Sequence, residues 1–137
     1  MNNFLKIFGL VLVVAVLFIV IQKIFFKTPS NDKDISTFVK TMNKTCPSMI
    51  DTETRLDKVM ASSDKNLQFN YTLIHMIKDS LPVEKLKNYM EPRILQKIKT
   101  SPTLNQFLYK NLTWIYSYND MSGKFIFKII YTPEQFK

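Results

Sequence analysis

Hydrophobic residues are arranged along this chain in two different ways. Residues 7–21 (IFGLVLVVAVLFIVI) form an unbroken apolar run, with Lys6 before it and Lys23 and Lys27 after it. Beyond residue 27, apolar residues are instead separated by polar ones at regular spacing. The first pattern is typical of a helix surrounded by lipid, and the second is typical of a folded domain in water.

The apolar run is long enough to cross a membrane. Residues 4–26 would form a helix about 34 Å long, whereas a bilayer has a hydrocarbon core of about 30 Å. Val, Leu, Ile and Phe surround this helix and leave no polar face, which disfavours a helix buried in a protein core. A cleaved signal peptide is the rival interpretation, but Ile24, Phe25 and Phe26 are too bulky for a cleavage site. We therefore expect residues 1–27 to be an uncleaved transmembrane anchor.

The lysines around this anchor give conflicting indications of its orientation. Lys6 precedes the run, whereas Lys23, Lys27, Lys33 and Lys40 follow it, and this bias favours a cytoplasmic C-terminal part. A domain of about 110 residues, however, translocates largely regardless of its charge. We expect a single-pass protein of the bacterial inner membrane with its C-terminal domain in the periplasm, and a cytoplasmic domain stays open as an alternative.

The remaining chain is predicted to contain a polar tether at residues 28–34 and one small domain at residues 35–137. Apolar residues recur at helical spacing in three segments: residues 35–43, 83–99 and 102–108. Pro92 predicts a kink in the second segment, or two consecutive helices. Apolar and polar residues alternate, as in strands, in four segments: residues 49–61, 67–76, 112–119 and 125–131.

The order of these elements predicts the fold class. Polar turns at residues 62–66 and 119–123 join the strands into two hairpins. The order helix, hairpin, helices, hairpin favours an α+β domain with a four-stranded antiparallel sheet and helices on one face. The core face of this sheet is predicted to include His75 and Phe125. The open face is predicted to expose three apolar residues, Ile115, Ile126 and Ile130.

Three short motifs resemble those of a known set of proteins. Residues 43–57 (NKTCPSMIDTETRLD) match the pattern N-x-x-C-P-x-x-x-D-x-x-T-R-L-D, residues 70–73 are NYTL, and residues 116–123 match Y-S-Y-x-D-x-x-G. The chain thereby resembles small bacterial exported or membrane-anchored proteins of unassigned function. The resemblance implies an exported, anchored domain, and it implies no activity, substrate or catalytic residue.

Composition excludes several classes of site. The chain has 137 residues with two glycines, one cysteine and one histidine, so a glycine-rich phosphate loop, a disulfide framework and a Cys/His zinc site are all excluded. We expect no cofactor and no metal. Lys plus Arg number 19 against 11 Asp plus Glu, a net charge of +8. Without Lys6, Lys23 and Lys27 the domain has 16 basic against 11 acidic residues, or +5, which does not favour nucleic acid as a partner.

Two groups of residues are candidates for chemistry or binding. Asp51, Glu53, Arg55 and Asp57 fall at every second position and would share one face of a strand. Arg55 would lower the pKa of the neighbouring carboxyls, so a salt-bridged or partner-binding face is favoured over acid–base catalysis. A nucleophilic thiol at Cys46 would need an activating base, and the chain offers one imidazole, that of His75.

These patterns favour a non-enzymatic interaction or structural protein of the cell envelope. It is expected to bind the bilayer through residues 4–26 and a protein partner through the open sheet face or the Asp51–Asp57 segment. Two alternatives stay open. One is a small periplasmic enzyme using Cys46 and His75 or the carboxylates of residues 51–57. The other is a cytoplasm-facing basic domain that binds anionic lipid or nucleic acid.

Overall fold

The computed structural model describes residues 32–137. The predicted anchor and most of the predicted tether lie outside the described residues. Three helices, α2 (Lys33–Thr45), α3 (Val83–Thr100) and α4 (Pro102–Asn105), accompany five strands: β1 (Ser48–Met49), β2 (Thr54–Ala61), β3 (Asn66–Leu73), β4 (Thr113–Asp120) and β5 (Phe125–Tyr131). Three short 3-10 helices, η1 (Lys78–Ser80), η2 (Leu108–Lys110) and η3 (Pro133–Phe136), complete the part that the structure describes. Within it, no helix has the length and apolar composition needed to cross a membrane.

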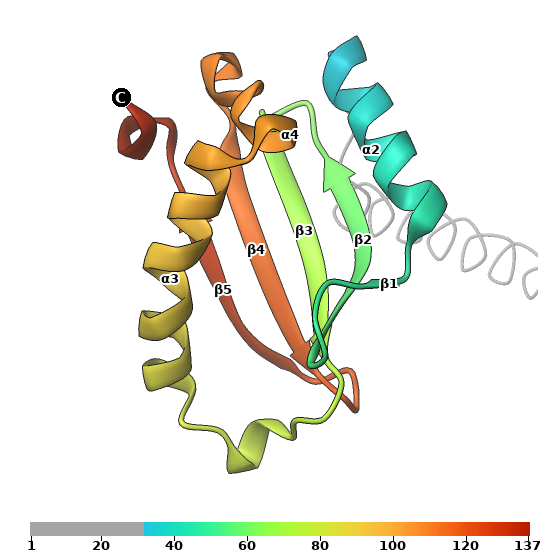
Figure 1. The fold of residues 1–137 in the computed structure, drawn as a ribbon, viewed down its shortest axis with the longest axis vertical. Helices are drawn as coiled ribbons and strands as arrows, with labels where there is room; N and C mark the ends of the chain where they lie inside the picture. The colour runs from blue at the N-terminus through green and yellow to red at the C-terminus, as the bar shows by residue number, and fades with distance from the viewer. Residues whose placement is uncertain (1–31) are drawn as a thin grey trace, which may run out of the picture.

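The sheet has the strand order β1-β2-β3-β4-β5 (Figure 1). Both predicted hairpins are present, since β2 pairs with β3 and β4 pairs with β5, each antiparallel. The expectation of four antiparallel strands is wrong, because β1 adds a fifth strand and β3 pairs with β4 in parallel. The chain between β3 and β4 contains α3 and α4, and such a helical crossover returns the chain to the end where β3 began. The fold is therefore α+β with a five-stranded mixed sheet.

The first helix begins and ends where the sequence indicates. The Asp32 side chain caps α2 by accepting hydrogen bonds from the backbone N–H groups of Asp34 (3.0 Å) and Ile35 (3.2 Å). The helix ends before the Cys46-Pro47 bond, which is cis. Asn43, close to this end, holds α2 against β2 through two hydrogen bonds to the backbone of Val59.

The long helix α3 is unbroken from Val83 to Thr100, so of the two alternatives expected at Pro92 the division into two helices is wrong, and a kink stays a prediction. A proline inside a helix removes one hydrogen bond and costs about 3 kcal/mol. Burial of Ile94 and Ile98 on the same helix offsets this cost, because each such side chain contributes roughly 1.5–3 kcal/mol. The Tyr131 hydroxyl also donates to the backbone carbonyl of Glu91 at 2.6 Å, which ties α3 to β5.

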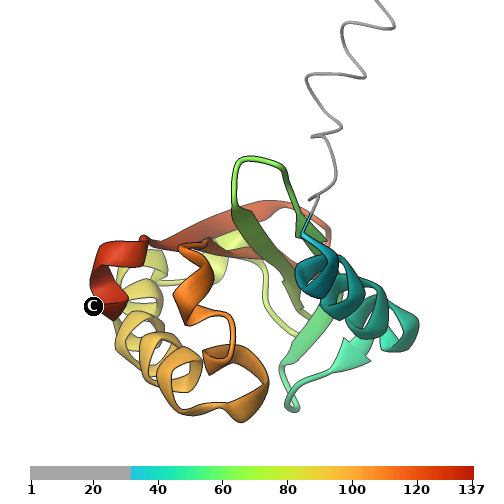
Figure 2. The same cartoon turned by 90° about the horizontal axis from the view of Figure 1, so that it is seen from above.

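The core is built on aromatic side chains that β3 and β4 share. Since the two strands are parallel and in register, the Phe69 ring stacks on Tyr116 with centroids 5.0 Å apart, and the Tyr71 ring stacks on Tyr118 at the same distance. Phe38 of α2 packs against Phe69 from above the sheet. Figure 2 shows α3 and α4 on one side of the sheet and α2 beside β2, to whose backbone Asn43 is hydrogen-bonded. Among residues 32–137, no helix covers the other face.

Three predicted side-chain positions are wrong, and a strand irregularity explains two of them. Between β4 and β5 the register shifts at Tyr118/Asn119, so Phe125 pairs with Asn119 and is 49% exposed, although it was expected in the core. The same shift buries Ile126, of which 5% is exposed. His75 lies in a turn beyond the end of β3 and its side chain is 64% exposed, so it does not continue the core face of that strand.

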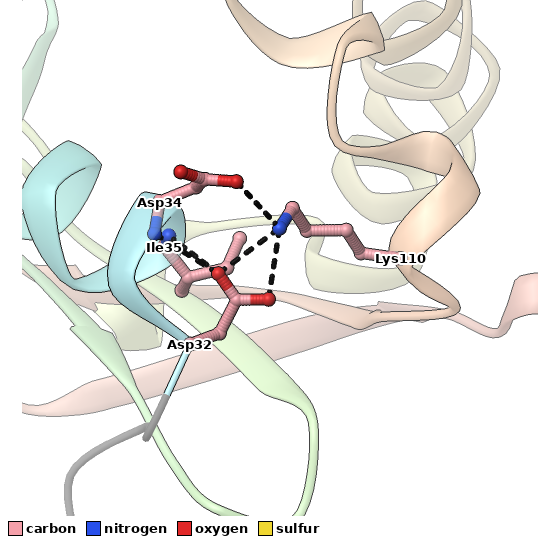
Figure 3. A network of polar contacts seen from close by, with 4 residues as sticks. All are labelled: Asp32, Asp34, Ile35 and Lys110. Carbon is pink, nitrogen blue, oxygen red and sulfur yellow. Dashed lines mark hydrogen bonds and ion pairs between the residues drawn. The ribbon is translucent and has the colours of Figure 1, made fainter.

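A partly buried lysine fixes the start of the first described helix. The Lys110 ammonium donates to both carboxylate oxygens of Asp32 (3.0 and 2.8 Å) and to Asp34 (2.9 Å) (Figure 3). These hydrogen bonds, first those with Asp32, raise the pKa of Lys110 well above its usual range, so its charge is retained. The start of α2 is thereby attached to η2, although 78 residues separate Asp32 from Lys110.

Candidate functional site

A groove lies on the helical side of the sheet, between α2 and the junction of α3 with α4. Its cavity has a volume of about 170 Å³. Met42 of α2 and Leu104 of α4 form its two apolar walls. Its floor is formed by the core-facing side chains of the sheet: Leu56, Phe69, Tyr71 and Tyr116. The lining is mostly apolar, so the groove is suited to an apolar ligand rather than to an ion.

The rim of the groove adds polar and exposed groups. Lys97 of α3 and Thr103 of α4 are exposed at one side, and Ile50, in the loop after β1, is 44% exposed at the other. Lys97 forms no ion pair with any described residue. The rim therefore offers one unpaired positive charge beside an apolar surface.

A second hollow lies along the same helix, nearer to the start of α2. Its volume is about 360 Å³, and it is lined by Thr37, Phe38 and Thr41 of α2 and, from the following segment, by Gln106, Phe107 and Tyr109, with Asp34 at its end. Asp34, Thr37, Phe38, Thr41 and Met42 fall at helical spacing. One face of α2 thus borders both hollows over most of the length of the helix.

The groove floor contains tyrosines that stay neutral. Burial raises the pKa of the Tyr71 and Tyr116 hydroxyls well above their usual range. Neither hydroxyl forms a hydrogen bond with another described residue. They can accordingly donate hydrogen bonds to a ligand, but they cannot act as bases at physiological pH.

The four charged residues at positions 51–57 do not share one strand face. Asp51 precedes β2 and accepts hydrogen bonds from the backbone N–H groups of Glu53 and Thr54, both at 2.8 Å. Glu53 contacts the His75 ring at 3.1 Å. The two acidic residues outside the strand therefore stabilise the turns that flank β2 and β3.

Arg55 and Asp57, by contrast, do lie together on β2. The Arg55 guanidinium pairs with Asp57 at 2.5 Å, and the other oxygen of Asp57 accepts from the Thr72 hydroxyl at 2.5 Å. The strand register shifts at Asp57, between Leu56 and Lys58. Both carboxylate oxygens of Asp57 are occupied, so this pair resembles a structural clamp more than a catalytic group.

The predicted apolar face of the sheet is present only in part. Ile115 and Ile130 are register partners on the open face, and Ile130 is 42% exposed. Ile126 is buried, so its predicted exposure is wrong. Met60, which sequence reasoning did not place on this face, is 38% exposed there.

Cys46 and His75 do not form an activated pair. Burial, and secondarily the charge of Asp57, raises the pKa of the Cys46 thiol, whereas an activated thiol needs a lowered pKa. The His75 ring contacts Glu53. Within residues 32–137, no three His, Cys, Asp or Glu side chains gather in a way that would hold a metal ion.

Sequence reasoning missed two features that matter here. The groove was missed because Met42 and Leu104 were each assigned to the buried face of a helix, and a gap between two such helices leaves no local signal. Asp120 was missed because the sequence pattern places it in a polar turn, whereas it is the last residue of β4. It is almost fully buried and accepts hydrogen bonds from the Ser122 hydroxyl and from the backbone N–H groups of Ser122, Lys124 and Lys78.

Comparison with known protein families gives one match. The family model described as Domain of unknown function (DUF8479) matches residues 30–127. No curated protein matches this chain in sequence.

Comparison with solved structures shows similarity in fold. A secreted protein from Pseudomonas aeruginosa has a TM-score of 0.61 and 9% identity, over 77% of this chain and 91% of that one. The pilotin EpsS from the type 2 secretion system of Vibrio vulnificus has a TM-score of 0.58 and 12% identity, over 75% and 88% of the two chains. The type II secretion system pilotin AspS from Vibrio cholerae has a TM-score of 0.54 and 8% identity, over 74% and 87%. At these identities the likeness is one of fold.

Proposed function

Since this chain belongs to the family described as Domain of unknown function (DUF8479), we propose that it is a non-catalytic protein of the bacterial cell envelope. In this proposal the groove between α2 and the α3–α4 junction binds an apolar, helical segment of a protein partner. The observation on which the proposal depends is the groove itself, which has an apolar floor and is bordered by helices on both sides.

The arrangement of the two hollows along α2 supports a helical ligand. The 13 residues of α2 extend over about 20 Å, and hollows border this helix toward both of its ends. A ligand helix of similar length would place apolar side chains at i, i+3, i+4 and i+7 against the floor. Lys97 at the rim would pair with a carboxylate of the ligand, since no described residue neutralises it.

The sequence and the fold support the cellular setting. Residues 4–26 are predicted to anchor the chain in the inner membrane with the domain in the periplasm. The proteins similar in fold are a secreted protein and two pilotins of type 2 secretion systems. A role in the envelope through contact with another protein is consistent with both observations.

The other binding surfaces predicted from the sequence have less support. Asp51 and Glu53 are occupied by contacts within the domain. Arg55 and Ile130 are accessible, but they lie on the open face of the sheet, away from the groove. An enzyme that uses Cys46 is disfavoured by the raised pKa of its thiol.

Site-specific photocrosslinking in cells that express the full chain tests the groove. A photoreactive phenylalanine replaces Thr103 or Ile50 at the rim, and matched controls carry it at Asn105 or Met49. Asn105 and Met49 are exposed neighbours on the same segments, and neither lines the groove. We expect a crosslinked product from the rim positions and little from the controls.

The identity of the crosslinked peptide completes this test. Mass spectrometry is expected to find a segment with apolar residues at helical spacing. In chains without the photoreactive residue, the substitution Thr103→Arg is expected to weaken the binding of this segment. Equal crosslinking at rim and control positions, or a crosslinked peptide without an apolar helical pattern, would contradict the proposed ligand.

A pair of topology fusions tests the location. One reporter that is active only outside the cytoplasm and one that is active only inside it are each attached after Lys137. Activity of the first reporter alone is expected. Activity of the second alone would support the cytoplasm-facing alternative.

A further inference from the structure

We propose that one end of the open sheet face rests on the surface of an anionic lipid bilayer. This end is defined by a row of register partners, Met60, Gln68, Ile115 and Ile130, which we call the membrane-facing row. The inference rests on the anchor of the proposed function and goes beyond it, because it assigns a second lipid contact to the folded domain.

Three of the four members of the membrane-facing row are apolar, and two of these three are well exposed. Met60 is 38% exposed and Ile130 is 42% exposed. Ile115 and Ile130 are direct partners on neighbouring strands, so their side chains lie side by side on one face. The helices α3 and α4 cover the opposite face and α2 lies beside β2 (Figure 2), and no described helix covers this row.

The row lies at the end of the sheet where the chain enters the domain. Asp32 is held by Lys110, which precedes the start of β4 by a short segment. The Thr113 N–H at the start of β4 donates to the Lys65 carbonyl in the β2–β3 turn at 2.9 Å. The start of α2, this turn and the start of β4 therefore share one end of the molecule, as Figure 1 shows. Met60 lies near the end of β2 that leads into this turn, and Ile115 lies near the start of β4.

The length of the connection keeps this end close to lipid. The four residues 28–31 separate the predicted anchor from Asp32 and reach at most about 14 Å when fully extended. The strands are longer, since the eight residues of β3 extend over about 26 Å. Asp32 therefore stays within one domain length of the bilayer surface, and the far end of the sheet does not need to approach it.

Two lysines beside the row offer positive charge to an anionic surface. The next row inward places Lys58 and Lys128 at its two sides, with Asn70 and Ser117 between them. Neither lysine forms an ion pair with a described residue. Asp57, the carboxylate nearest to this row in sequence, is bound by Arg55 and Thr72. Apolar side chains in front of two unpaired lysines match the layering of a bilayer surface, where acyl chains lie beneath phosphates.

Depth-dependent quenching in the full chain tests this contact. A Cys46→Ser chain receives a single fluorescent label at Met60→Cys or Ile130→Cys, and a matched chain receives it at Met121→Cys. Met121 is 56% exposed in the β4–β5 turn, at the opposite end of the sheet. The labelled chains are reconstituted in vesicles of phosphatidylcholine with or without phosphatidylglycerol. The label is then quenched by a lipid-borne nitroxide or by aqueous iodide.

We expect lipid quenching at positions 60 and 130 to exceed that at position 121 several-fold in vesicles with phosphatidylglycerol, and to weaken in vesicles without it. The two lysines of the next row inward provide a second test. Lys58→Glu with Lys128→Glu, combined with a label at position 130, should lose most of the lipid quenching while the chain still floats with the vesicles.

The outcomes separate the two proposals. If the chain floats with vesicles but labels at 60 and 130 are as accessible to iodide as the label at 121, the lipid contact of the row is wrong and the anchor stands. If the chain does not float with the vesicles, the lipid contact of the row and the predicted anchor are both wrong. If the labels are shielded only after envelope proteins are added, the row binds a protein instead of lipid, and this inference is again overturned.

Discussion

The side-chain amide of Asn43 is hydrogen-bonded twice to the backbone of Val59. Its nitrogen donates to the Val59 carbonyl and its oxygen accepts from the Val59 N–H, both at 2.8 Å. Asn43, near the end of α2, thereby satisfies the backbone N–H and carbonyl of Val59 in β2, next to the register shift between Leu56 and Lys58. The same helix borders the groove, so this clamp fixes one groove wall against the sheet.

Asn43→Ala should lower the free energy of unfolding by about 2–3 kcal/mol, because two hydrogen bonds are lost and two backbone groups of Val59 lose their partner. Urea unfolding of the full chain in detergent measures this change. Asn43→Asp keeps the side-chain oxygen that accepts from the Val59 N–H, so its loss of unfolding free energy should be about half that of Asn43→Ala. The exposed Asn105→Ala is the control, and an equal loss in both alanine variants would contradict the assigned clamp.

Ile126 and Ile130 provide a comparison within one strand. Ile126 is 5% exposed and Ile130 is 42% exposed. Ile126→Ala should therefore cost about 2–4 kcal/mol of unfolding free energy, as expected for a truncated core residue, and Ile130→Ala should cost less than about 1 kcal/mol. Urea unfolding of both variants checks this. Equal costs would mean that the register shift at Tyr118/Asn119 is wrong.

Asp120 should make stability depend on pH in acid. The hydrogen bond from the Ser122 hydroxyl, followed by those from backbone N–H groups, holds the pKa of this carboxyl well below its usual range. A carboxyl with a lowered folded-state pKa stabilises the fold above its unfolded pKa of about 3.9, and this stabilisation is lost as the pH falls through and below that value. The urea midpoint of the full chain should drop below about pH 5, and Asp120→Asn should remove part of that drop. An unchanged pH profile in Asp120→Asn would contradict this role.

Lys110→Met should loosen the start of α2. The variant removes the three hydrogen bonds that the ammonium donates to Asp32 and Asp34 and leaves two carboxylates close together. Amide hydrogen exchange in the first turn of α2 should become faster, while exchange in β4 should stay unchanged. Lys124→Met is the matched control, because Lys124 pairs with Asp79 at an exposed site of the opposite end. Equal protection in wild type and Lys110→Met would show that the contact does not order the helix start.

Cys46 should react slowly with thiol reagents. The raised pKa of its thiol lowers the fraction of thiolate at neutral pH, and the thiolate is the reactive form. Alkylation by iodoacetamide at pH 7 should be several-fold slower than alkylation of a cysteine introduced at exposed Met121 in a Cys46→Ser chain. A faster reaction at Cys46 would revive the hypothesis of a catalytic thiol.

The motifs that underlie the resemblance receive a structural explanation from these contacts. Asn43 clamps α2 to β2, Asp51 caps a turn, and Asp120 with Gly123 shapes the β4–β5 turn, where Gly123 has a φ of 85°. Each residue satisfies backbone groups that would otherwise lack partners. Their pattern in the sequence therefore indicates a fold more directly than it indicates a ligand.

Local patterns determined the elements of this domain. The helix at residues 35–43, the two hairpins and the turn at Gly123 follow from spacing, capping and turn residues, which act over a few positions. The buried face of β3 followed from strict alternation. His75 was placed wrongly because that alternation continues in the sequence beyond Leu73, where the strand has already ended.

Only the tertiary structure decided how those elements combine. The parallel pairing of β3 with β4 depends on where a crossover of helices returns the chain, and the burial of Ile126 depends on a register shift between two strands. The groove exists because α2 and α4, about 60 residues apart in the chain, pack beside each other without closing the space between Met42 and Leu104. Spacing in a sequence reports the period of one element, whereas a groove or a register is a relation between several elements, set by the packing that buries the most apolar surface.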